Sequence, residues 1–102
     1  MQSSHNIQQA NVARASGLLK AISNKTRLSI VCLLAENEMS VGELLDVIPL
    51  SQSAMSQHLA LLRRGKIVKT RRQAQSIIYS LSSSEAKTIV ATVHKLFCDD
   101  EN

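Results

Sequence analysis

Two short helix signals, joined by a tight turn at the chain's only proline, constrain this fold most. Ser40 and Glu43 form a capping-box pattern, in which a hydroxyl and a carboxylate bond reciprocally to the backbone at a helix start. Pro49 cannot continue that helix and moves the residue before it away from helical angles. Ser51 then supplies a second N-cap. The pattern predicts a helix-turn-helix whose second helix spans 51–64.

This second helix has one apolar face and one polar face. Met55, Leu59 and Leu62 recur at helical spacing and predict the buried side. His58 lies at the edge of that side, where we expect a partly buried hydrogen-bonding role. A helix of this kind fits the major groove, and its N-terminal residues reach base edges. The polar candidates for DNA contact at this end are Ser51, Gln52, Ser53, Ser56 and Gln57.

A basic cluster and two strand patterns follow the helix. Six of the twelve Lys and Arg residues fall within ten positions: Arg63, Arg64, Lys66, Lys69, Arg71 and Arg72. Alternating apolar residues predict strands over 67–72 and 76–81, which together form a hairpin over 67–81. A basic hairpin beside a helix-turn-helix is a wing that meets phosphates or the minor groove. Gln73 and Gln75, near the hairpin tip, complete the set of candidate DNA contacts.

The remaining helical patterns complete the fold. Helices are predicted over 7–22, over 25–36 behind an Asn24 cap, and over 84–98 behind a Ser82–Glu85 capping box. Their apolar stripes are Val12, Ala15, Leu19 and Ile22; Leu28, Val31, Cys32 and Ala35; and Ile89, Val93 and Leu96. Four helices, two strands and a last helix define a mainly α fold with a small β-hairpin (α+β). We expect one winged helix-turn-helix domain over 1–102.

Composition favours double-stranded DNA as the partner. The formal net charge is +4, and 44% of the residues are hydrophobic, which suits a globular basic protein. Tyr79 and Phe97 are the only aromatic residues, whereas RNA and single-strand binders stack bases on aromatic rings. No apolar stretch of about 18 residues indicates a membrane span. We expect a cytoplasmic protein that binds duplex DNA and neither RNA nor membranes.

The sequence also resembles a known family. Leu-Ser-Gln-Ser-Ala-Met-Ser-Gln-His-Leu over 50–59, with Leu-Leu-Arg-Arg over 61–64, is similar to the recognition helix of the ArsR/SmtB regulators. Residues 21–28 and 75–81 share this similarity, which extends over 12–98 and is greatest to the HlyU-like, redox- and sulfide-responsive branch. The resemblance implies a homodimer paired through helices 7–22 and 84–98. It also implies two recognition helices in successive major grooves, about 34 Å apart.

One position departs from the family pattern. Members usually carry Asp-Gly between the recognition helix and the first wing strand, whereas this chain has Gly65-Lys66. We expect a different backbone there, and the cation favours phosphate binding.

The effector is less constrained than the fold. Residues 39–46 contain no Cys or His, and His94 has only Asp99, Asp100 and Glu101 nearby in sequence. Tetrahedral zinc needs about four ligands, so we predict no metal site and no cofactor. A metal-responsive or effector-independent regulator of the same fold remains an alternative.

Two cysteines are the other effector candidates. The family resemblance implies that Cys32 and Cys98 form a switch, joined by a disulfide or a polysulfide that weakens DNA binding. From the residues alone, Cys32 on an apolar stripe is equally a core residue. The helix C-terminus and the acidic tail oppose a thiolate at Cys98.

Two other function classes are less favoured. A thiol enzyme would need a Cys-x-x-Cys pair or a nucleophile with a base and an orienting group, and the sequence contains neither. We therefore predict no enzymatic activity. A dimerising interaction module without DNA binding is the remaining alternative, and its weak affinity for DNA would scarcely respond to salt.

Overall fold

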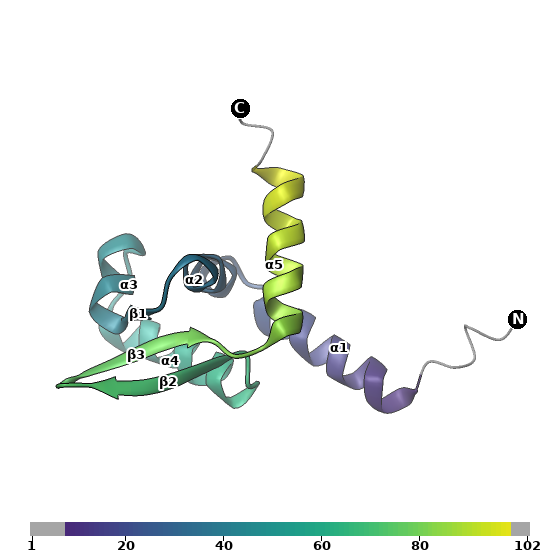
Figure 1. Cartoon of the computed structure of the whole chain (residues 1–102), viewed down its shortest axis with the longest axis horizontal. Coiled ribbons are helices and arrows are strands. Elements are labelled where there is room, and N and C mark those ends of the chain that lie inside the picture. The colour runs from purple at the N-terminus through teal and green to yellow at the C-terminus, as the bar shows by residue number, and fades with distance from the viewer. Residues whose placement is uncertain (1–7, 99–102) are drawn as a thin grey trace, which may run out of the picture.

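The structure is a computed structural model that describes residues 8–98 (Figure 1). The helices of this part are α1 (Gln9–Ile22), α2 (Lys25–Glu36), α3 (Val41–Val47), α4 (Gln52–Arg64) and α5 (Ser84–Phe97). The strands are β1 (Met39–Ser40), β2 (Val68–Gln73) and β3 (Ser76–Leu81). This arrangement confirms the predicted winged helix-turn-helix fold.

The sheet contains one strand that the sequence pattern did not predict. Its antiparallel order is β1-β3-β2, so the two-residue strand β1 pairs with the outer side of the wing hairpin. Met39 lies opposite Tyr79, and Ser40 lies opposite Ile78. A two-residue strand has no periodicity of its own, and it becomes visible only when its partner lies beside it.

Most element bounds agree with the predictions. Helix α2 and strand β3 have the predicted bounds, and α4 begins directly after the Ser51 cap. Helix α1 begins at Gln9 rather than at residue 7, which lies outside the described residues. Strand β2 is displaced by one residue from the predicted 67–72, and α5 ends at Phe97 with Cys98 as its C-cap.

The predicted helix caps hold with one exception. Asn24 caps α2, Ser51 caps α4, and Ser40 and Glu43 make both bonds of the capping box at α3. The box predicted over Ser82–Glu85 is wrong, because the cap of α5 is Ser83, whose hydroxyl accepts from the Ala86 N–H at 3.0 Å. The Ser82 hydroxyl instead donates to the Lys66 carbonyl at 2.8 Å.

The core lies between α2, α4 and the inner face of the sheet. Met55, Leu59 and Leu62 are fully buried, as the polar and apolar faces of α4 predicted. The stripe predicted for α2 was wrong, because Ala35 is exposed and the buried residues are Ile30, Val31 and Leu34. Helix α2 contacts α1, α4, α5 and β3, so neighbours on several sides determine which of its faces is covered.

Helices α1 and α5 extend from this body as two arms (Figure 1). The apolar stripes predicted for them are largely uncovered: Val12 and Leu19 are 45% and 52% exposed, and Leu96 is 66% exposed. Phe97 is 73% exposed. The radius of gyration is 15.3 Å, against about 13 Å for a compact chain of 100 residues. The arms therefore carry apolar surface that one protomer does not bury.

Candidate nucleic-acid interface

Helix α4 presents its polar face to solvent because its other face is anchored in the core. Gln52, Ser53, Ser56 and Gln57 are all exposed, and they project from the first two turns of the helix. The Ser51 hydroxyl accepts from the Ala54 N–H at 3.1 Å, so it caps the helix that carries these side chains. This hydroxyl also lies 3.4 Å from that of Ser53.

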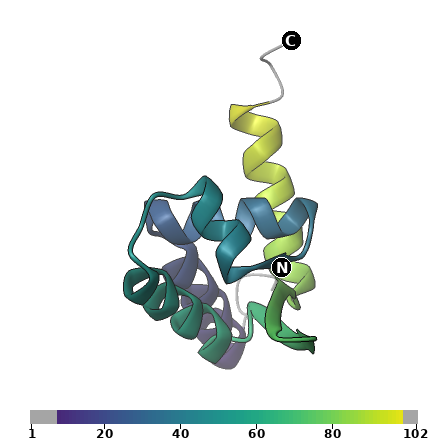
Figure 2. The same cartoon turned by 90° about the vertical axis from the view of Figure 1, so that its left-hand side faces the viewer.

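The β2–β3 hairpin lies on the same side of the molecule as α4. Figure 2 shows both at the bottom of the view, while the C-terminal part of α5 points to the top. Side chains alternate along a strand, so Lys69, Arg71 and Gln73 share one face of β2 and Arg72 lies on the other. The wing therefore offers cations on both of its faces.

All predicted DNA contacts are accessible. The exposed set comprises Ser51, Gln52, Ser53, Ser56, Gln57, Arg63, Arg64, Lys66, Lys69, Arg71, Arg72, Gln73 and Gln75. Exposure is required for DNA contact, and the contacts themselves remain a prediction.

One wing arginine is held by a partner that the sequence did not reveal. The Arg71 guanidinium pairs with the Glu38 carboxylate, from the connection between α2 and β1, and donates to Gln73 Oε1 at 2.8 Å. Glu38 stands 33 positions before Arg71, and no local motif marks it. DNA phosphates must compete with this carboxylate for Arg71.

The junction between α4 and the wing has the altered backbone expected there. Lys66 has a φ of 60°, in the left-handed region that favours glycine, whereas Gly65 has an ordinary φ of −78°. The Ile67 N–H donates to the Leu62 carbonyl at 3.0 Å, and the Lys66 N–H donates to the Arg63 carbonyl at 2.9 Å. These two bonds define a Schellman motif, in which the residue at the left-handed position is usually glycine.

The hairpin tip also places a non-glycine residue in the left-handed region. Ala74 has a φ of 56° within the two-residue loop between Gln73 and Ser76. A positive φ at the first loop position only is the pattern of a type II′ turn, which matches the twist of the strands. The sequence indicated no turn type, because this loop contains neither Gly nor Asn.

The two cysteines, which are distant in sequence, come near each other where α2 packs against α5. Cys32 is half-buried on α2, Cys98 is exposed at the end of α5, and both are free thiols. Burial raises the pKa of the Cys32 thiol, and the nearby Cys98 and Glu36 raise it further. The exposed Cys98 is therefore the more accessible of the two to a solution oxidant or alkylating reagent.

Two observations concern metals and membranes. Within residues 8–98, no three His, Cys, Asp or Glu side chains gather closely enough to hold a metal ion. Asp99, Asp100 and Glu101, which the zinc alternative would use, lie outside this part of the chain. No helix among the same residues has the length and apolar character needed to cross a membrane.

An exposed, capped helix beside a basic β-hairpin, both mounted on a helical core, defines a winged helix-turn-helix DNA-binding protein. Residues 24–70 match the bacterial regulatory proteins of the arsR family. The transcriptional activator HlyU of Vibrio cholerae is 52% identical over 90 residues, which are 88% of this chain and 83% of that protein. The chain belongs to the ArsR family of bacterial regulatory proteins.

Solved structures agree with this assignment. HlyU from Vibrio cholerae has a TM-score of 0.87 and 51% identity, and the match covers 90% of this chain and all of that one. The transcriptional repressor BigR from Xylella fastidiosa has a TM-score of 0.82 and 39% identity, covering 88% and 92% of the two chains. The protein is thus a DNA-binding transcriptional regulator of the HlyU-like kind, and these relatives are named as regulators, not as enzymes.

Proposed function

We propose that the protein is a cytoplasmic, homodimeric regulator that binds a specific double-stranded DNA sequence, with residues 1–102 forming one domain. The exposed polar start of α4 beside the basic wing carries this proposal. Base edges in the major groove are read by Gln52, Ser53, Ser56 and Gln57. Phosphates are bound by the cations at the end of α4 and the start of the wing, which are Arg63, Arg64, Lys66 and Lys69. Arg72 and, once released from Glu38, Arg71 extend the contact along the wing.

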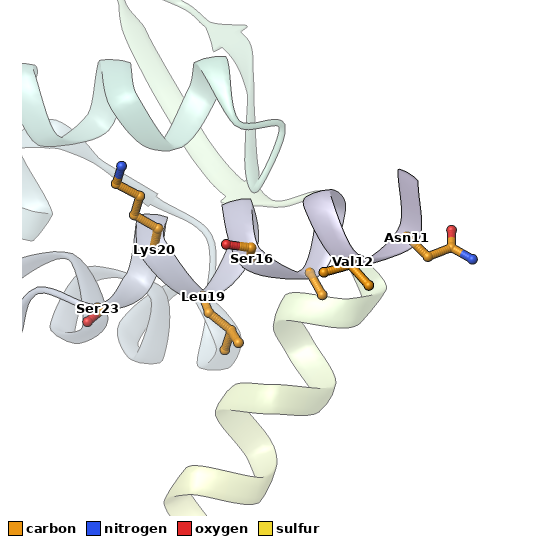
Figure 3. Close-up of a pocket in the computed structure, with 7 residues that line it drawn as sticks. Asn11, Val12, Ser16, Leu19, Lys20 and Ser23 are labelled. Carbon is orange, nitrogen blue, oxygen red and sulfur yellow. The ribbon is translucent and has the colours of Figure 1, made fainter. Parts of the chain in front are cut away.

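The uncovered arms support the dimer. Val12 and Leu19 point to the same side of α1, beside a shallow pocket, while Lys20 points the other way (Figure 3). Leu96 and Phe97 expose further apolar surface at the end of α5. A monomer gains nothing by exposing four large apolar side chains on two arms, whereas a second copy buries them. Pairing through α1 and α5 leaves α4 and the wing free in each protomer.

We further propose that Cys32 and Cys98 switch this DNA binding. With a peroxide as oxidant, the two thiols form one S–S bond and the peroxide is reduced to two waters; a polysulfide bridge retains added sulfur between the same residues. The raised pKa of Cys32 and the exposure of Cys98 favour initial oxidation at Cys98, followed by attack of Cys32. Bridging draws the end of α5 toward α2 and changes the geometry of the dimer arms. A solved structure of Vibrio cholerae HlyU is described as reduced, so the redox state of that relative is defined.

The decisive experiment measures binding to a labelled duplex taken from the DNA upstream of the protein's own gene. Reduced, peroxide-treated and persulfide-treated protein are compared with the variants Cys32→Ser and Cys98→Ser over a range of salt concentrations. We expect salt-sensitive binding that weakens on treatment, recovers with reductant, and is insensitive to treatment in both variants. Binding that is indifferent to treatment would refute the switch and retain the DNA-binding function, whereas salt-independent weak binding would favour an interaction module.

A further inference from the structure

An arginine outside the DNA-facing surface joins three helices. Arg27, in the first turn of α2, donates from Nε to the Ala21 carbonyl of α1 at 2.6 Å. Its Nη1 lies 3.3 Å from Nδ1 of His58 on α4. The backbone N–H of Arg27 donates to Oδ1 of the helix cap Asn24 at 3.0 Å, which holds the arginine at the start of α2. The guanidinium therefore forms a bridge between the end of α1 and the middle of α4.

Both ends of this bridge need what a guanidinium provides. Ala21 is in the last turn of α1, where carbonyls have no partner within the helix and where a cation is favoured by the helix dipole. His58 offers an acceptor 31 positions away in sequence. The planar guanidinium presents several donors in fixed directions, so it reaches both acceptors at once, whereas a lysine ammonium is a single point of charge.

The bond to His58 also specifies a protonation state. Arginine only donates, so Nδ1 of His58 must be the acceptor, which requires a neutral ring with its proton on Nε2. A protonated His58 would place two cations against each other. Helices α1, α2 and α3 and strand β2 pack against α4, and none of their described acidic groups contacts His58. Lys20, in the last turn of α1, adds another cation to this set of elements.

His58 lies next to the DNA-facing surface in sequence and in space. It follows Gln57, which is exposed on the DNA-facing side, and precedes Leu59, which is 1% exposed and fixed in the core. A force on His58 therefore rotates or displaces the turn of α4 that carries Ser56 and Gln57. The other end of the bridge is α1, which we have proposed as part of the dimer interface.

We propose that Arg27 is a positioning residue that couples α1 to the DNA-reading helix through neutral His58. The inference rests on the proposed DNA-binding function for its consequence. DNA affinity then depends on the Arg27–His58 bond, although neither residue belongs to the predicted DNA contacts. Protonation of His58 breaks the bond and weakens DNA binding, as does any substitution of Arg27 that cannot serve both acceptors.

The test is the pH profile of DNA affinity at constant ionic strength, measured by fluorescence anisotropy with the duplex described above. We expect the wild-type dissociation constant to rise about 5- to 10-fold between pH 8 and pH 5.5, within the range of ordinary coupling between sites. Asparagine places a carbonyl oxygen near the position of Nδ1 and does not titrate. His58→Asn should therefore bind as tightly as wild type at pH 8 and show a flat profile.

Two further variants separate positioning from mere stability. Arg27→Lys keeps the charge but not the fork, and we expect about 10-fold weaker binding at pH 8 with a reduced pH dependence. His94→Asn, at the other described histidine, is the matched control and should retain the wild-type profile. A stabilising role alone would lower the melting temperature of Arg27→Lys without altering the pH profile of DNA affinity.

A spectroscopic measurement tests the bridge without DNA. The ¹⁵N shifts of the His58 ring should report the Nε2–H tautomer in wild type and a mixture of tautomers in Arg27→Lys. A predominantly Nδ1-protonated ring in wild type would overturn the inference, as would tight DNA binding with a flat wild-type profile. Failure of wild-type protein to bind the duplex at pH 8, with the expected ring shifts, would instead count against the proposed function.

Discussion

Replacing Lys66 by glycine should make the protein more stable while weakening its grip on DNA. Lys66 has a φ of 60° in the Schellman motif that ends α4. An L-residue in this conformation costs about 1–2 kcal/mol relative to the right-handed region. Glycine removes this strain but adds about 0.5–1 kcal/mol of unfolded-chain entropy. The net gain in the free energy of unfolding is about 0.5–1 kcal/mol.

The charge of Lys66 must be separated from its backbone. A cation just past the end of α4 interacts favourably with the helix dipole, and any neutral substitution loses that contribution. Lys66→Ala is therefore the reference, because it loses the same charge and retains the left-handed strain. We expect Lys66→Gly to melt about 2–8 °C above Lys66→Ala at the same protein concentration, as measured by thermal unfolding.

The neighbouring glycine provides the control. Gly65 has a φ of −78°, and an added Cβ would meet its nearest atoms at 3.6 Å, an ordinary contact. Gly65→Ala should thus be neutral or slightly stabilising. If Gly65→Ala were strongly destabilising and Lys66→Gly no better than Lys66→Ala, the assignment of the left-handed position would be wrong. Both Lys66 variants should reduce the slope of log K against log salt by about 0.9, because one phosphate contact is lost.

Three further perturbations follow from the same structure. Alkylation followed by mass spectrometry should label Cys98 before Cys32 at pH 7, and labelling of Cys32 should accelerate as the pH rises through and beyond 9, because its raised pKa keeps the thiol protonated; equal rates at pH 7 would contradict the difference in exposure. Glu38→Gln should release Arg71 and strengthen binding to any duplex by about 2- to 5-fold, with a steeper salt dependence and lower sequence discrimination; unchanged affinity would show that DNA does not compete with Glu38. Leu19→Glu should dissociate the dimer in sedimentation experiments at micromolar concentration, since a charge replaces a 52% exposed apolar side chain of the proposed interface; a dimer that persists would place the interface elsewhere.

Local patterns determined the recognition unit because its signals are short in range. The capping residues Ser40 and Ser51 act on backbone groups three positions away, and the apolar face of α4 follows the helical period. For the same reason the exposed faces of α4 and the wing, with their candidate DNA contacts, were predicted correctly as surface. Cap choice was less certain where serines are consecutive: at α5 the hydroxyl of Ser82 goes to Lys66, and Ser83 becomes the cap.

The sequence by itself thus determined the winged helix-turn-helix, its polar reading face and the concentration of positive charge in the wing. Only the tertiary structure decided the contacts between residues about thirty positions apart, such as Arg71 with Glu38 and Arg27 with His58. It also decided that the stripes of α1 and α5 remain exposed and that Lys66 takes the left-handed position. These features depend on which elements pack together, and neither periodicity nor capping encodes the distance between segments that only the folded core brings into contact.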